Sequence, residues 1–484
     1  MSAPLDLDFL VAATGGTVWR TGATRFTGVA IDGRAVPKGG AWFAIRGDTH
    51  DGHRFASQAY LSGARCLVLE RGRAGEQTIY PEDASIVEVD DTVKALGRLA
   101  REHRARLRSL RVVGVTGSNG KTTTKEMIAA ILAAHAGDAA VHKTEGNFNN
   151  HLGLPLTLLK LTPAHRFAVI EMGMSARGEI AYLADLARPD VGVIVNVGPV
   201  HLETLGSLDE VARAKGELFA ALGPAGAAVY PDGDERIAAQ ASASPAVRRI
   251  RFGERAGVEV RVVSARAHVE GTEAALRLPD GARISTRLAA IGRHHAGNAA
   301  AAAGAALAAL GSAASPEAIA RGLRAARPEK HRSSMIDAGG VKVFDDCYNA
   351  SPLSTGAALD ALAAVKGGGR AIAVLGDMLE LGADEDVLHR SIGERAARLG
   401  LDLLVTVGAR ARQTAEGALQ AGMDPERVRH AATTDEAAAE AARVAAAGDV
   451  VLVKGSRGMK LERVVEALRA TFAAAQHIAG REAP

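Results

Sequence analysis

Cysteine is scarce in this chain: among 484 residues it occurs only as Cys66 and Cys347. Their spacing fits neither a disulfide framework nor a metal site, and so little cysteine is typical of a reducing compartment. An excess of one charge is lacking too, because the formal net charge is only +3. That value gives no reason to expect nucleic acid or a membrane surface as a partner.

Long hydrophobic runs and a secretion signal are also lacking. No apolar stretch reaches the length that spans a membrane, and the first residues, MSAPLDLDFL, carry two aspartates and no basic group. We therefore expect a cytoplasmic protein without stable membrane insertion. The composition, 47% hydrophobic and 23% charged, is that of a globular protein, and the length predicts two to four domains.

Three blocks follow one another along the chain and predict an α/β protein. Residues 1–108 mix short strands with turns and a helix over 53–63, and the basic stretch 101–111 is interpreted as an exposed helix face and a linker. Residues 109–327 and 328–484 each alternate apolar strands with helices, which predicts a sheet in each, parallel in the middle block. There the strands are expected at 110–115, 167–171 and 191–197, and helices near 121–135 and 208–222.

A glycine-rich loop follows the first strand of the middle block. The stretch TGSNGKTTT, residues 116–124, lies between that strand and a predicted helix. The strict phosphate-loop pattern has a glycine where this chain has Val115, but the second half of the pattern is intact. Loop N–H groups and the positive end of the helix can hold phosphate oxygens. Lys121 can reach the terminal phosphates and Thr122 can bind Mg²⁺, so a nucleotide site is predicted.

Glu171 and His201 follow later strands of the same block. Active sites of such sheets lie at the carboxyl ends of their strands. The Glu171 carboxylate is therefore placed to hold Mg²⁺ or a water on it, although a surface acid is the alternative. A lone histidine such as His201 is more often structural or simply exposed.

Lys215 falls on the apolar stripe that Leu208, Val211, Leu218 and Leu222 form at helical spacing. A lysine there must extend its amine to solvent or be used. Burial lowers the pKa of a lysine and favours the neutral amine. A neutral amine can react with CO₂ to give a carbamate, which is an anionic metal ligand.

Other polar groups give weaker signals. Asn298 precedes an alanine-rich helix, where capping that helix is the plain alternative. In the last block, polar clusters follow two strands and suggest binding of anions, or else solvated loops: Asp345, Asp346, Tyr348 and Asn349, then Lys454, Ser456, Arg457 and Lys460. Together the residues support a Mg²⁺-nucleotide enzyme whose flanking domains bring other substrates. A nucleotide-driven switch is the alternative, but it needs no buried lysine and no second metal.

Longer motifs carry a resemblance that covers nearly the whole chain. TGSNGKTTT resembles the nucleotide loop of the Mur ligases and the related folylpolyglutamate synthases. GNFNNHLGLPLTLL, VIEMGMSARGEI, NVGPVHLETLGS and ARAKGELF resemble consecutive central-domain motifs of the Mur ligases. DDCYNASPLSTGAALDAL and VLGDMLELGADEDVLHR are similar to the last domain of members that add D-alanyl-D-alanine to UDP-N-acetylmuramoyl-tripeptide. FTGVAIDGR resembles the domain for the uridine nucleotide.

The resemblance implies the domains and the chemistry. Residues 1–108 would form a small α/β UDP-substrate domain, 109–327 a central ATPase domain with the phosphate-binding loop, and 328–484 a Rossmann-like α/β domain for the incoming dipeptide. ATP would activate the tripeptide as an acyl phosphate, which the amine of D-alanyl-D-alanine attacks. Two Mg²⁺ ions and a carbamylated Lys215 are implied as cofactors. The protein is expected to be a monomer.

The resemblance also implies residue roles. Lys121, Glu171, His201 and Lys215 would be catalytic. ATP would contact Gly117, Ser118, Asn119, Gly120, Lys121, Thr122, Thr123, Asn298, Arg332 and Asp346. The metal ligands would be Thr122, Glu171, His201 and the carbamate of Lys215. The other substrates would contact Thr27, Asp32, Arg34, Asn147, Asn149, Asn150, Tyr348 and Asn349.

Two relatives and two departures define the limits of this resemblance. Members that add diaminopimelate or lysine carry an Asp-Asn-Pro-Arg motif, which this chain lacks, and folylpolyglutamate synthases lack the long first block. The family often has serine where this chain has Gly33, and Arg332 stands in PEKHRSSM instead of a Pro-Gly-Arg motif. The third residue of the peptide, diaminopimelate or lysine, stays open.

Overall fold

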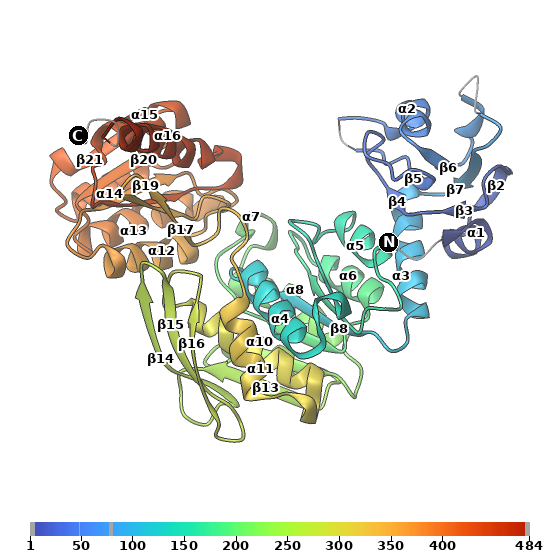
Figure 1. The fold of residues 1–484 in the computed structure, drawn as a ribbon, viewed down its shortest axis with the longest axis horizontal. Coiled ribbons are helices and arrows are strands. Elements are labelled where there is room, and N and C mark those ends of the chain that lie inside the picture. The colour runs from blue at the N-terminus through green and yellow to red at the C-terminus, as the bar shows by residue number, and fades with distance from the viewer. Residues whose placement is uncertain (1–4, 48, 77–80, 480–484) are drawn as a thin grey trace.

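The computed structural model describes residues 5–47, 49–76 and 81–479. Figure 1 shows three bodies, with the N-terminal part (blue) and the C-terminal part (orange to red) on opposite sides of the central part (cyan to yellow). Each body contains its own main β-sheet. The predicted α/β class with three sheet-containing parts is confirmed.

The N-terminal part is built on a five-stranded sheet in the order β2-β7-β6-β5-β4, in which only β2 runs antiparallel to its neighbour. The helix expected over 53–63 is present as a short 3₁₀ turn followed by α2. The elements are β1 (Leu5–Asp6), α1 (Leu7–Thr14), β2 (Thr17–Arg20), β3 (Arg25–Phe26), β4 (Val29–Ala30), β5 (Gly40–Phe43), α2 (Ala56–Leu61), β6 (Ala64–Glu70), β7 (Ser85–Val89) and α3 (Thr92–Arg106).

The central part has a nine-stranded sheet in the order β16-β15-β14-β13-β12-β11-β8-β10-β9. Its strands are β8 (Arg111–Thr116), β9 (Val141–Lys143), β10 (Phe167–Glu171), β11 (Val191–Ile194), β12 (Ala227–Pro231), β13 (Arg248–Gly253), β14 (Val260–His268), β15 (Gly271–Arg277) and β16 (Arg283–Leu288). Its helices are α4 (Lys121–Ala136), α5 (Gly153–Leu159), α6 (Glu179–Ala187), α7 (Leu202–Leu205), α8 (Leu208–Ala220), α9 (Glu235–Ala243), α10 (His295–Leu310) and α11 (Pro316–Ala325).

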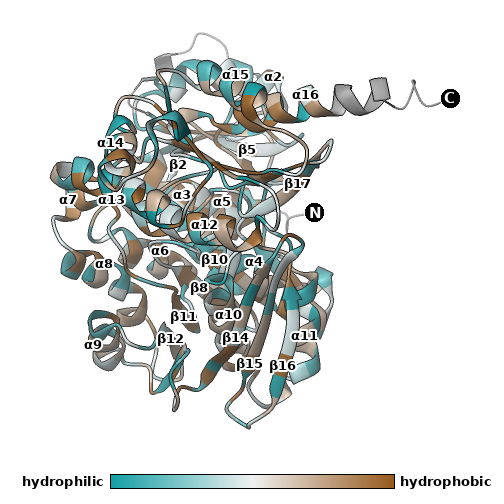
Figure 2. Cartoon of the chain, turned by 90° about the vertical axis from the view of Figure 1, so that its left-hand side faces the viewer, coloured by the Kyte–Doolittle hydropathy of each residue, from teal (hydrophilic) through white to brown (hydrophobic). Residues whose placement is uncertain are grey.

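This sheet is parallel from β9 to β14, as expected, but β15 and β16 add an antiparallel edge that the sequence analysis did not predict. Strands β8 and β10 lie close to their predicted bounds, whereas β11 stops three residues early, at Ile194. The early end frees residues 195–201 to form a loop beside the phosphate-binding loop. Figure 2 shows the hydrophobic residues along β11 and β12 that make the interior of this part.

The alanine-rich helix α10 lies in the core against α4 and the sheet. Small side chains let the helix approach the sheet closely. The stretch His295–Ala313 is long and apolar enough to span a membrane by length and composition alone, contrary to the expectation that no such stretch exists. However, 67% of its most apolar window is buried inside the protein, which is the environment of a core helix.

The C-terminal part has a six-stranded sheet in the order β17-β18-β22-β19-β20-β21, parallel except for β17. Its elements are β17 (Ser334–Ala338), β18 (Val341–Asp345), α12 (Pro352–Val365), β19 (Ala371–Gly376), α13 (Glu385–Arg398), β20 (Leu403–Val407), α14 (Arg412–Gln420), β21 (Val428–Ala431), α15 (Thr434–Val444), β22 (Val450–Lys454) and α16 (Glu462–Ala479). Helix α12 packs against β14, so this part rests on the antiparallel edge of the central sheet.

The basic stretch 101–111 is only partly the exposed face that was expected. His103 and Arg104 are buried, because α3 packs against α5 and α6 of the central part. The guanidinium of Arg104 donates hydrogen bonds to the carbonyl oxygens of Ala187 and Leu110. These contacts fix the first part of the chain on the second, so the interpretation as a solvated linker is wrong for these two residues.

Candidate active site

The phosphate-binding loop joins β8 to α4 at the carboxyl end of the central sheet. Gly120 precedes α4 with φ 77°, a backbone conformation that favours glycine. A Cβ atom there would lie only 2.7 Å from the side-chain oxygen of Asn298. Asn196 fixes the loop, because its side chain accepts from the Asn119 N–H and donates to the Asn119 carbonyl oxygen. Loop and helix therefore have the predicted form.

Lys121 reaches back over this loop. Its Nζ donates to the carbonyl oxygen of Gly117 at 2.7 Å and to that of Ser118 at 3.3 Å. Enclosure lowers the pKa of Lys121, which the nearby Glu171 carboxylate partly opposes. The ammonium is thus held where the phosphates of a bound nucleotide would replace carbonyl oxygens as its partners.

Glu171 ends β10 beside the loop and is 2% exposed. Its Oε1 accepts a hydrogen bond from Asn149 Nδ2 at 2.8 Å, while its Oε2 is buried without a hydrogen-bond partner among the described residues. An unpartnered buried carboxylate oxygen is costly. With the buried hydroxyl-bearing Thr122 lining the same cavity, this oxygen fits the role of a Mg²⁺ ligand.

Lys215 is buried on α8, as the apolar stripe predicted, and is 2% exposed. Burial lowers its pKa well below the usual value, and the charge on Lys121 lowers it further. The alternative, an amine extended to solvent, is wrong. The possible metal ligands in this region are the imidazole of His201 and the amine of Lys215, which burial favours in its neutral form. They fit a metal site only if the amine becomes a carbamate, which supplies an anionic oxygen.

His201 lies near both lysines, at the start of α7, with φ 54°. Burial lowers its pKa, and the charges on Lys121 and Lys215 act in the same direction while Glu380 opposes them. Its Nδ1 lies 2.8 Å from Oε2 of Glu380, which belongs to the C-terminal part. His201 and Lys215 therefore lie close enough for the charge on one to affect the other, and Glu380 is a partner of His201 that the sequence analysis missed.

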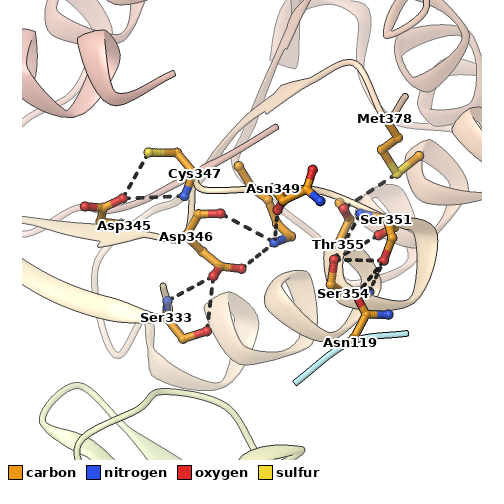
Figure 3. A network of polar contacts seen from close by, with 11 residues as sticks. Asn119, Ser333, Asp345, Asp346, Cys347, Asn349, Ser351, Ser354, Thr355 and Met378 are labelled. Carbon is orange, nitrogen blue, oxygen red and sulfur yellow. Dashed lines mark hydrogen bonds and ion pairs between the residues drawn. The ribbon is translucent and has the colours of Figure 1, made fainter. Parts of the chain in front are cut away.

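The C-terminal part closes over the loop with residues that follow β18. In Figure 3, Ser351 at the start of α12 donates from its hydroxyl to the side-chain oxygen of Asn119 at 3.0 Å. Asp346 accepts from Lys454 Nζ at 2.6 Å and from the Ser333 N–H at 2.9 Å. The positive charge of Lys454 is therefore paired with Asp346. Arg457 is paired with Glu462. We expected the basic loop after β22 to bind an anion. Because Lys454 and Arg457 are both engaged in ion pairs, these two residues give that expectation no support.

A cavity of about 400 Å³ lies between the two parts. It brings together most of the residues expected at the nucleotide and some of those expected at the other substrates: Ser118, Asn119, Gly120, Lys121, Thr122, Thr123, Asn147, Asn149, Glu171, Asn298, Arg332, Asp346, Tyr348 and Asn349. Gly117 belongs to the loop but is not in the lining of this cavity. The cavity also contains His294, His295 and Lys454, which the expected set did not include.

Asn298 lies inside the first turn of α10, after the helix has begun at His295. Its Nδ2 is 3.1 Å from Nδ1 of His295 and its oxygen faces Gly120. The capping interpretation is therefore wrong. Burial lowers the pKa of His294 to about 4 and that of His295 well below its usual value, so both are neutral groups at the edge of the cavity.

A second hollow shares Lys121 and Asn149 with the first and extends to Asn150, Arg177 and His201. The side-chain oxygen of Asn150 is occupied, because it accepts from the N–H groups of Leu152 and Gly153. Because this second hollow lies beside the phosphate-binding loop, it suits a substrate whose reacting end must meet the nucleotide.

The three residues expected at the uridine nucleotide lie apart from both hollows, in the N-terminal part. Thr27 Oγ1 donates to the carbonyl oxygen of Lys38. Asp32 and Arg34 form an exposed ion pair of 2.9 Å, and hydrogen bonds from Arg34 lower the pKa of Asp32 to about 2. Their role stays a prediction.

A phosphate-binding loop that faces a second α/β unit across a cavity is typical of nucleotide-dependent enzymes that act on a further substrate. Comparisons with known proteins narrow this class. Residues 25–104 match the family description "Mur ligase family, catalytic domain", 115–306 match "Mur ligase middle domain", and 331–457 match "Mur ligase, glutamate ligase domain".

Individual proteins match over almost the whole chain. The UDP-N-acetylmuramoyl-tripeptide–D-alanyl-D-alanine ligase of Bacillus subtilis is 38% identical over 91% of this chain and 93% of its own length. A crystal structure of MurF from Acinetobacter baumannii has a TM-score of 0.86 at 32% identity, covering 97% of this chain and 99% of that chain. MurF from Thermotoga maritima in complex with ADP has a TM-score of 0.79 at 28% identity, covering 93% and 98%. The chain belongs to the Mur ligase family.

Proposed function

We infer that the chain is an ATP-dependent ligase that joins D-alanyl-D-alanine to UDP-N-acetylmuramoyl-tripeptide. The products are the UDP-linked pentapeptide, ADP and phosphate, in the synthesis of peptidoglycan precursors. One observation carries this inference: the chain matches relatives with that activity in their names over more than nine-tenths of their length, and it has the Gly-Lys-Thr end of the phosphate-binding loop. The ADP complex of the Thermotoga maritima protein supports ATP as the nucleotide.

The chain's own residues fit both steps of the reaction. A carboxylate oxygen of the tripeptide attacks the γ-phosphorus of ATP, the bond to ADP breaks, and an acyl phosphate forms. The amine of D-alanyl-D-alanine then attacks the acyl carbon, and phosphate leaves from a tetrahedral intermediate. Lys121 would stabilise the charge on the transferring phosphoryl group. Closure by the residues around Ser351 would keep water from the acyl phosphate.

Two Mg²⁺ sites are part of the proposal. Thr122 and Oε2 of Glu171 would hold the ion that accompanies ATP. His201 and a carbamate on Lys215 would hold the second, and the burial and lowered pKa of Lys215 support this assignment. Bound ions would neutralise charge on the phosphoryl and acyl oxygens.

The remaining assignments are proposals of the same kind. Residues 1–108 would bind the uridine nucleotide through Thr27, Asp32 and Arg34, residues 109–327 would bind ATP, and residues 328–484 would bind the dipeptide. Gly117, Asn298, Arg332 and Asp346 would border ATP, Asn147, Asn149 and Asn150 the UDP-sugar, and Tyr348 and Asn349 the dipeptide. A monomeric state, a cytoplasmic location and no binding to nucleic acid stay predictions.

Release of phosphate from ATP tests the function directly. The purified chain is given UDP-N-acetylmuramoyl-tripeptide with D-alanyl-D-alanine, and in parallel with D-alanine, meso-diaminopimelate or glutamate. We expect release only with D-alanyl-D-alanine, together with a pentapeptide product identified by mass. Release that is independent of the acceptor would contradict the proposal and indicate a hydrolase or a switch. Tripeptides ending in lysine and in diaminopimelate, run side by side, identify the third residue.

A further inference from the structure

The segment 329–333 crosses from the central part to the C-terminal part and carries Arg332 into the nucleotide cavity. The guanidinium carbon of Arg332 lies 4.0 Å from the centre of the Tyr348 ring. Its Nε is buried without a hydrogen-bond partner among the described residues. An unpartnered guanidinium nitrogen in a cavity indicates a group that awaits an anionic ligand.

The residues on either side of Arg332 have unusual backbones. His331 has φ 65° and Ser333 has φ 44°, both in the left-handed region that side chains other than glycine rarely adopt. Such conformations are strained and persist only where surrounding contacts enforce them. The segment must therefore be held by specific bonds on both sides.

On the side of the central part, the bond is an ion pair between a buried lysine and a partly buried carboxylate. Lys125 is fully buried, and its Nζ lies 2.6 Å from Oε1 of Glu329 and 2.7 Å from the carbonyl oxygen of Thr144. Lys125 stands one helical turn after Lys121 on α4, so the two side chains share a face of that helix. The helix that would hold the phosphates thus also holds the start of the segment.

On the side of the C-terminal part, the bonds run to the residues after β18. His331 Nδ1 lies 2.9 Å from Oδ2 of Asp345, and its carbonyl oxygen accepts from the Tyr348 N–H. Asp345 is itself 2% exposed and also accepts from the Cys347 thiol. Directly after Arg332, the Ser333 N–H donates to Asp346. The segment is thereby fixed along the loop that borders the nucleotide.

We propose that Glu329 and His331 are positioning residues, which hold the segment on Lys125 and Asp345 so that Arg332 meets the phosphates of the nucleotide. The inference rests on the proposed function, because it takes Arg332 as a nucleotide contact. It assigns to Lys125, Glu329, His331 and Asp345 a role in nucleotide affinity, although none of them borders the cavity.

A double-mutant cycle on ADP affinity, measured by calorimetry on the full chain, tests this role. Arg332→Met is expected to weaken ADP about tenfold or more, and His331→Ala about fivefold. The combined variant should bind no more weakly than Arg332→Met alone. His331→Asn should recover most of the affinity, because asparagine tolerates a positive φ and can donate to Asp345.

Two further variants separate positioning from general stability. Glu329→Gln should also weaken ADP severalfold and lose that effect in the Arg332→Met background. His103→Asn removes another buried histidine contact, to the carbonyl oxygen of Leu161, and should leave ADP affinity unchanged. Additive losses in the double variants, or wild-type affinity in both His331→Ala and Glu329→Gln, would overturn the proposal. Because ADP binding needs no acceptor, this result is independent of the ligation assay.

Discussion

Lys215 is an amine in a place where its charge is unfavourable. It is 2% exposed, between apolar neighbours of α8 and near the ammonium of Lys121. Its pKa in the folded chain lies well below 10.5, the usual value for lysine. At a pH between the folded pKa and 10.5, the unfolded chain therefore binds a proton that the folded chain does not. Stability contributed by this residue therefore rises with pH across that window. A protein that keeps such a lysine has a use for the neutral amine.

Replacing Lys215 separates stability from activity. Lys215→Met should raise the Tm in CO₂-free buffer by roughly 2–4 °C at pH 7, and the gain should shrink as pH rises toward 10.5. Turnover should fall on the order of 10³-fold. Scanning calorimetry and phosphate release measure the two effects. Lys215→Ala should regain some activity with formate or acetate, and full activity without them would refute the carbamate.

Oε1 of Glu171 accepts a hydrogen bond from Asn149, whereas Oε2 has no partner in the part of the chain that the structure describes. Glu171→Gln retains an acceptor for Asn149 but loses the charge that Mg²⁺ requires. We expect ADP alone to bind as it does to the native chain, whereas the gain in affinity on adding Mg²⁺ should fall roughly tenfold. Calorimetry with and without Mg²⁺ measures both quantities. An unchanged gain with Mg²⁺ would remove Glu171 from the metal site.

At the scale of elements, the start of α12 has two functions. Ser351 caps the helix through a reciprocal bond with Ser354, and its hydroxyl also contacts Asn119 of the phosphate-binding loop. Ser315 also caps a helix before a proline: its hydroxyl oxygen accepts from the Ala318 N–H of α11, without a reciprocal bond or a hydrogen bond to the loop among the described residues. Of these two serine caps, only Ser351 contacts the phosphate-binding loop.

Ser351→Ala and Ser315→Ala form a matched pair. Each should lower the free energy of unfolding by about 1 kcal/mol through the lost cap. Only Ser351→Ala should also raise the KM for ATP, about 2–10-fold, because the loop loses a hydrogen bond that fixes it against the C-terminal part. Denaturant titration and steady-state kinetics distinguish the effects. An equal rise in KM for both variants would mean that the contact with Asn119 does not matter.

Local patterns predicted the elements and the core of the site, because those depend on neighbours in the sequence. The apolar run at 167–171 and the glycine loop before Lys121 needed no tertiary information. The antiparallel edge formed by β15 and β16 was missed, and so was the burial of Arg104, because each depends on residues far away in the sequence. Glu380 stands in the motif VLGDMLELGADEDVLHR, but nothing in the local sequence marks it as a partner of His201, which it meets only in the folded chain.

At the scale of the whole molecule, the site exists only where the central and C-terminal parts meet. Asn119 and Ser351 form one contact across this boundary, His201 and Glu380 form another, and Lys125 with Glu329 fixes the connecting segment. Surface ion pairs contribute little to stability, and the Glu380 side chain is 64% exposed. The second contact is therefore better explained by what it does to His201 than by its energy.

Glu380 should set the orientation of His201. A carboxylate at Nδ1 keeps the proton on that nitrogen and leaves Nε2 free to bind a metal ion, as in many metal sites. Glu380→Ala should therefore raise the Mg²⁺ concentration for half-maximal turnover about 10-fold or more, and Glu380→Gln less, since its amide oxygen can still accept. Glu385→Ala, which removes another exposed ion pair of the same part, serves as the control. If both alanine variants shift the Mg²⁺ requirement equally, the pair with His201 contributes only to surface charge, and domain closure does not complete the metal site.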